Sequence, residues 1–238
     1  MKIYKYITFF FGLYIGHAQP IGYLSLPTEG KLHIAVIFID YADDTIDPQN
    51  PSWVVGKGPT YINDVIDTSE FFPSNNPNNI TTYFREMSGG KLVITGKSYY
   101  KQAQHSYQYY RSLAGTEPFD IYDLIFEDVL KSLDSTVDFS QFDNWTLKSV
   151  NSSLVITKGK DNNIDLIINC YRSISIKTPE GWPWFKNNWS SILTNDGVYP
   201  YIGIHIMNSF QYPRMEHIYH EIGHFLGLYH QYNGGMWS

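Results

Sequence analysis

The chain has 238 residues, of which 43% are hydrophobic and 17% charged, which gives enough apolar material for one sizeable core. Its formal net charge of −6 at pH 7 argues against a nucleic acid or an anionic membrane as partner, because both require a basic surface. The single cysteine, Cys170, excludes an intramolecular disulfide, and its apolar neighbours favour a small buried side chain.

The N-terminus has the pattern of a targeting segment. Lys2 and Lys5 precede a short apolar run over 7–16, and Gly16 and Ala18 supply the small residues of a cleavage site. We therefore expect a signal peptide over 1–18, a short lead segment over 19–30 and a secreted, extracellular protein. The alternative, a hydrophobic strand or helix at the start of the domain, fits this order of features less well. No later run approaches the roughly 18 apolar residues of a membrane span, so we expect no integral membrane segment in the mature chain.

The remaining residues, 31–238, are predicted to form one domain in which strands and helices are mixed, of the α/β or α+β class. A continuous run of β-branched residues predicts a first strand that is buried on both faces. A segment rich in Pro, Asn and Gly, about 47–79, is predicted to be mostly loop. The predicted strands are Leu32–Ile39, Lys91–Tyr100, Leu154–Ile156, Ile164–Cys170 and Tyr201–Met207, and the predicted helices are Ile80–Met87, Asp120–Leu133 and one starting near Pro213.

The most specific motif is HEIGHFLGLYH over residues 220–230. Residues four apart share one helical face, so His220 and His224 can bind the same ion. Gly227 allows the helix to end in a left-handed residue, after which His230 can return as a third ligand. Three histidines leave one zinc position open for water, which is typical of a catalytic site. The pattern therefore predicts a zinc site formed by His220, His224 and His230.

The residue after the first ligand, Glu221, is the predicted catalytic base. Zinc would lower the pKa of its bound water toward neutrality and polarise the scissile carbonyl. Glu221 would accept the proton of that water as it attacks, then deliver it to the leaving amine. The motif therefore predicts a zinc-dependent metalloendopeptidase that acts on proteins or peptides. A core helix with coincidental histidines is the competing interpretation, which the length of the motif disfavours.

The other histidines are predicted to lie outside the zinc site. His33 and His105 have no partner at metal-binding spacing, which favours structural roles. His217 lies on roughly the same helical face as His220, but a helix-surface side chain is the favoured interpretation. His205 could face either the cleft or the core.

The extended motif matches the metzincin pattern HExxHxxGxxH, and the chain resembles the secreted bacterial zinc metalloproteases of the immune-inhibitor-A type (M6-like). This resemblance implies a zincin-like domain, with a twisted mixed sheet and an active-site helix. It also implies zinc bound by His220, His224 and His230, Glu221 as the base, and in some members calcium. Members often carry Asp where this chain has His230, which remains a competent ligand. The supporting upstream segments are Ile34–Asp40, Tyr83–Leu92, Val137–Asp143 and Asp161–Asp165.

Calcium is a second candidate cofactor, at two groups of oxygen ligands. For both groups a solvated acidic turn is the favoured interpretation. The groups are Asp161, Asn163 and Asp165, at alternate positions, and Asp40, Asp43 and Asp44, after the first predicted strand.

Two other functions compete with a peptidase. One is a non-catalytic secreted or surface binding protein that retains a zinc-supported fold, which the intact Glu221 disfavours. The other is a zinc hydrolase of a different substrate. Ile202–Met207 as an edge strand could pair with an extended peptide, which favours a peptidase.

Only eight residues, Gln231 to Ser238, follow the third predicted ligand. Metzincin-like proteases have a methionine-containing turn after this ligand, for which Met236 is a candidate, although an ordinary loop fits equally well. We therefore expect a C-terminal subdomain that is short or missing, in a catalytic domain truncated at its C-terminus.

Overall fold

The computed structural model describes residues 29–44, 53–71, 73, 76–114, 120–150, 153–157, 163–171, 188–189, 193–197, 201–207 and 215–226. At 120, 145–150, 153–157, 163–171, 188–189, 201–207, 217, 221 and 224–225 it describes the backbone and not the side chains. The predicted signal peptide over 1–18 and nearly all of the predicted lead segment lie outside these residues.

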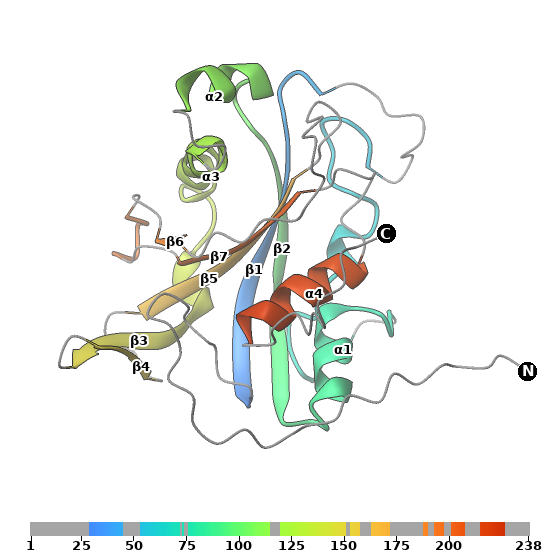
Figure 1. Cartoon of the computed structure of the whole chain (residues 1–238). Helices are drawn as coiled ribbons and strands as arrows, with labels where there is room; N and C mark the ends of the chain where they lie inside the picture. The colour runs from blue at the N-terminus through green and yellow to red at the C-terminus, as the bar shows by residue number, and fades with distance from the viewer. Residues whose placement is uncertain are drawn as a thin grey trace, which may run out of the picture.

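In the described part of the chain, a mixed sheet of seven strands forms the centre (Figure 1). Four strands, in the spatial order β2, β1, β5 and β7, are parallel to one another, while β3, β4 and β6 pair antiparallel. This mixed α/β architecture agrees with the predicted class. The strands are β1 (Gly30–Asp40), β2 (Leu92–Gln102), β3 (Asp143–Val150), β4 (Ser153–Thr157), β5 (Asn163–Tyr171), β6 (Asn188–Trp189) and β7 (Tyr201–Met207).

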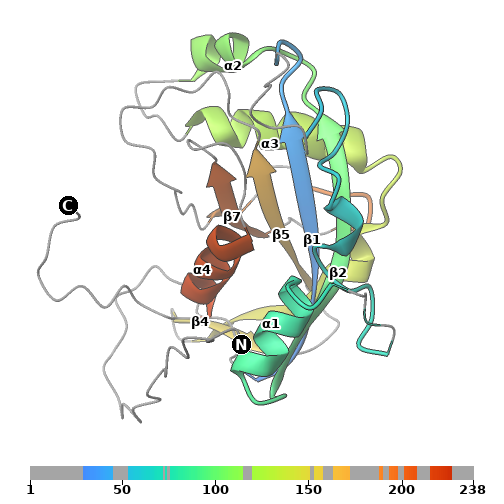
Figure 2. The ribbon, with the colours of Figure 1, turned by 90° about the vertical axis from the view of Figure 1, so that its right-hand side faces the viewer.

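Helices cover both faces of the sheet: α1 and α4 lie on one face, and α2 and α3 on the other (Figures 1 and 2). The predicted bounds of α1 and α3 are confirmed, whereas α2 was not predicted. In the part of the chain that the structure describes, no helix is both long and apolar enough to cross a membrane. The helices are α1 (Ile80–Met87), α2 (Tyr107–Leu113), α3 (Asp120–Leu133) and α4 (Met215–Phe225), with single 3-10 turns at η1 (Ile62–Asp64) and η2 (Phe139–Phe142).

The strand β1 divides the core into two clusters, because successive side chains of a strand point to opposite faces. Leu32, Ile34, Val36 and Phe38 pack with α1 and α4, and the alternate residues over 35–39 pack with α2 and α3. The prediction of a first strand buried on both faces is therefore confirmed.

The hairpin of β3 and β4 lies beside the start of β1. There the side chain of Asn144 makes the backbone hydrogen bonds that a neighbouring strand would otherwise make. The Asn144 amide accepts from the His33 backbone N–H (2.6 Å) and donates to the His33 carbonyl (2.7 Å). It also donates to the Phe142 carbonyl (2.6 Å), and the Phe142 ring stacks on the His33 imidazole, with centroids 5.3 Å apart. These contacts fix the position of β3 relative to β1, although Asn144 and His33 lie 111 positions apart in the sequence.

Candidate active site

The first six residues of the zinc motif, 220–225, lie within α4, as predicted. One side of this helix, formed by Ile218, Ile222 and Leu226, is buried in the cluster that also contains β1, β2 and α1. At about 100° per residue, positions 220 and 224 share the opposite side of the helix. The side chain of His220 is exposed, which agrees with this geometry. The core thus fixes which side of α4 is turned away from the sheet.

The structure describes only part of the predicted ligand set. His220 is described fully, Glu221 and His224 only as backbone positions of α4, and His230 and Met236 lie outside the described residues. Among the side chains that are described, no three metal-ligating groups come together. The helix is therefore confirmed, and the zinc ligands and the base stay predictions.

The end of α4 lies close to the predicted point. The helix ends at Phe225, and the Leu226 backbone N–H still bonds to the Ile222 carbonyl (3.1 Å). The buried Leu226 side chain anchors this last turn. Gly227, predicted to reverse the chain, is the next residue and lies outside the described ones.

A side chain that the sequence analysis did not single out, Tyr219, holds α4 against α1. Its ring stacks on that of Tyr83, and burial raises the pKa of its hydroxyl, with smaller contributions from Tyr83 and Glu216. The phenol therefore keeps its proton at neutral pH. Helical periodicity could have indicated that Tyr219 lies near the core side of α4, since it follows Met215 by four positions and precedes Ile222 by three, but not that it stacks on Tyr83.

The strand β7, which precedes α4 in the chain, pairs along one edge with β5. On its other edge, within the described part of the chain, β6 pairs only with Tyr201 and Ile202. The predicted strand over 201–207 is confirmed, whereas pairing with a peptide substrate stays a prediction. His205 lies on β7 opposite Asn169, and its side chain is outside the described set.

The acidic segment after β1 differs from the predicted solvated turn. Asp40 is fully buried, and its carboxylate accepts from the Gly56 N–H and the Tyr100 hydroxyl, both at 2.9 Å. Asp44 is also buried and accepts from a backbone N–H of its own turn (3.2 Å), while Asp43 accepts from the first N–H of α2 (3.2 Å). The turn prediction was wrong for Asp40 and Asp44, because the chain folds back over the end of β1. In these bonds the three carboxylates accept from different donors.

The other calcium candidate lies at the start of β5. Asn163 and Asp165 are strand positions, paired with Thr146 and Asp143 of β3, so the predicted acidic turn was wrong for these two, whereas the predicted strand Ile164–Cys170 already included Asp165. Alternate positions of a strand share one face, so the two remain on the same side of the sheet. Asp161 lies outside the described residues, and calcium binding stays a prediction.

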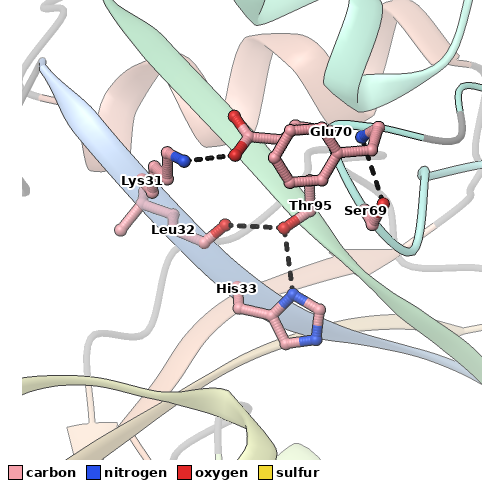
Figure 3. A network of polar contacts seen from close by, with 7 residues as sticks. Lys31, Leu32, His33, Ser69, Glu70 and Thr95 are labelled. Carbon is pink, nitrogen blue, oxygen red and sulfur yellow. Dashed lines mark hydrogen bonds and ion pairs between the residues drawn. The ribbon is translucent and has the colours of Figure 1, made fainter.

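Two histidines have the structural roles that were predicted. The His33 ring contacts the Thr95 hydroxyl through Nδ1 (3.0 Å), in a chain of polar contacts that continues to the Leu32 carbonyl (Figure 3). Burial lowers the pKa of His33, which keeps its imidazole neutral. The His105 ring packs on that of Tyr109, with centroids 3.9 Å apart. His217 lies on α4, and its side chain is not among those described.

Comparison of the chain with known protein families and with curated protein sequences gives no match. The motif and the orientation of α4 in the fold are therefore the features that bear on function.

Proposed function

We propose that this chain is a secreted zinc-dependent metalloendopeptidase with a zincin-like catalytic domain. The observation that carries the proposal is the orientation of α4. Its buried side, Ile218, Ile222 and Leu226, turns positions 220 and 224 away from the sheet. Had those positions faced the core, the two imidazoles would have been buried packing residues with no open position for water or substrate.

The donor set suits zinc. Two histidines at i and i+4 can bind one ion from a single helix, and His230 would complete three nitrogen ligands. Zinc, when bound, would polarise the scissile carbonyl and acidify a water molecule. The mixed sheet with the motif helix against one face is compatible with the zincin-like arrangement that the resemblance implies.

The residues of the chain have separate tasks in this proposal. His220, His224 and His230 would hold the metal. Glu221 would accept a proton from the attacking water and return it to the nitrogen of the leaving amine, so the peptide bond is cleaved with no net change in the carboxylate. Secretion is supported by the charged, apolar and small-residue order of the first 18 residues.

The proposal is tested with purified protein and casein as substrate. We expect casein cleavage that stops when 1,10-phenanthroline removes the metal and that returns when zinc is restored. Cleavage that continues at full rate without metal would refute the proposal. Protein that binds zinc in equimolar amount but cleaves neither casein nor short peptides would favour the binding protein that keeps a zinc-supported fold.

A further inference from the structure

The motif helix α4 is tied to α1 through Tyr219, the residue directly before the first predicted zinc ligand. Its ring lies parallel to that of Tyr83, with centroids 4.0 Å apart and 4° between the planes. It also meets the Phe84 ring edge-on at 6.3 Å, and its hydroxyl donates to the backbone carbonyl of Asn78. All three contacts reach one short segment, α1 and the residues just before it.

That segment is firmly held by its cap and by the core. Asn79 accepts from the Thr82 N–H (2.8 Å), which caps α1, and its amide donates to the buried carboxylate of Asp67. The Ile80 N–H donates to the Val65 carbonyl (2.9 Å), and the Ile80 side chain is fully buried. The start of α1 is thus a fixed reference against which α4 can be oriented.

Tyr219 lies at a position on α4 from which its contacts can restrict rotation of the helix about its axis. It lies about 100° from Ile218 on one side and about 100° from His220 on the other, at the border of the buried side. Side-chain tips lie roughly 6 Å from a helix axis, so a rotation of about 10° moves them by about 1 Å. An error of about 1 Å in a reacting group can lower a rate roughly hundredfold.

We propose that Tyr219 is a positioning residue, which uses the Tyr83 ring and the Asn78 carbonyl to fix the rotation of α4 that turns positions 220 and 224 toward a metal. The inference rests on the proposed zinc function and extends it to residues outside the ligands and the base. It also brings α1, more than 130 residues earlier in the chain, into the site.

The test compares Tyr219→Leu and Tyr83→Leu with Tyr109→Leu, which removes an exposed tyrosine from α2 on the other face of the sheet. Zinc affinity is measured by competition with a chromophoric chelator, and the absorption spectrum of the Co²⁺-substituted protein reports ligand geometry. We expect both α1–α4 variants to bind zinc at least about tenfold more weakly with an altered Co²⁺ spectrum, and Tyr109→Leu to match the wild type. In peptide hydrolysis we expect kcat to fall about tenfold or more while KM stays within about threefold.

A folded Tyr219→Leu variant with wild-type zinc affinity and Co²⁺ spectrum would overturn the inference, as would equal losses in Tyr109→Leu. If Tyr219→Leu does not fold, Tyr219→Phe decides, because it keeps the ring stack and loses only the hydroxyl donation. We expect it to bind zinc about two- to fivefold more weakly, and wild-type affinity would overturn the inference. Wild-type protein that binds no zinc would instead refute the proposed function. If the wild type binds zinc but cleaves no peptide, zinc affinity and the Co²⁺ spectrum still decide the role of Tyr219.

Discussion

Gly96 of β2 lies directly opposite Ile34 of β1, at a point where the two strands leave no room for a side chain. A Cβ atom at position 96 would lie 1.9 Å from the Ile34 carbonyl oxygen and 3.0 Å from Cδ1 of Ile66. On the other side, the Gly96 N–H donates to the Asp67 carbonyl (2.8 Å). Position 96 is therefore enclosed from both sides, next to the buried network that caps α1.

We expect Gly96→Ala to lower the free energy of unfolding by about 2–3 kcal/mol, because two backbones must separate to admit the methyl group. Denaturant unfolding followed by circular dichroism measures this loss. The matched control is Gly89→Ala, at a position with φ of 62° and open space around it, which should cost only about 1 kcal/mol for the left-handed backbone. Equal losses in the two variants would show that the close approach to Ile34 is unimportant.

His220→Ala should abolish stoichiometric zinc binding and leave the metal-free protein nearly as stable as the wild type. His220 is exposed and lies away from the buried side of α4, so we expect its loss to change the free energy of unfolding by less than about 1 kcal/mol. Ile222→Ala, on the buried side of the same helix, should cost about 2–4 kcal/mol. Metal content by mass spectrometry and denaturant unfolding measure the two effects. Retention of zinc in the His220 variant would remove it from the ligand set.

Glu221→Gln should separate metal binding from catalysis. The amide cannot accept the proton of the attacking water, so we expect kcat for peptide hydrolysis to fall by at least about hundredfold. Zinc content should stay equimolar, because Glu221 is not a predicted ligand. Wild-type turnover in a zinc-loaded Glu221→Gln protein would contradict the assignment of Glu221 as the catalytic base. Loss of zinc would show that Glu221 contributes to zinc binding.

The buried His33 should make stability depend on pH. Burial lowers the pKa of His33 in the folded protein, so below the ordinary histidine value of about 6.5 the unfolded chain binds more protons than the folded one. The free energy of unfolding should therefore be unaffected by this group above that pH and should fall as the pH drops toward the lowered pKa. Denaturant unfolding at several values between about pH 7.5 and pH 5 measures the slope.

The variants His33→Gln and Thr95→Val test whether the buried His33 imidazole causes this pH dependence of stability. His33→Gln has no titrating group there and should reduce the slope. Thr95→Val removes the hydroxyl that contacts Nδ1 but keeps the ring buried, so the slope should remain. A slope that His33→Gln leaves unchanged would assign the pH dependence to other groups.

Local periodicity was sufficient where an element is long and one of its sides is apolar. The pattern of apolar residues predicted the bounds of α3, Asp120–Leu133, and of the seven-residue strand β7, Tyr201–Met207, without error. The end of α1 was also predictable, because two glycines follow it and glycine readily ends a helix. In the structure Gly89 and Gly90 have φ of 62° and 82°. The helix that carries the zinc motif was predicted for the same reason.

Short elements held by distant partners could not be predicted in this way. The seven-residue α2 has a mostly polar sequence and depends on the Ser106 cap, whose hydroxyl accepts from the Tyr109 N–H (3.1 Å), and on burial of Tyr110. Ser106 before a polar-aromatic run was the one local signal available for it. The strand β3 pairs with β4 and β5, and its Asn144 also bonds to His33, a partner 111 residues away that no local pattern encodes.

The sequence by itself determined the helix and strands around the motif and the residue types that make zinc the expected metal, since both follow from local spacing and side-chain chemistry. Only the tertiary structure decided which side of α4 faces the sheet, because that depends on how Ile218, Ile222 and Leu226 fit against β1 and α1. It also decided that Asp40 is a buried acceptor, and that Tyr219 stacks on Tyr83. These features depend on long-range packing, in which the contacting residues come together only when the chain has folded.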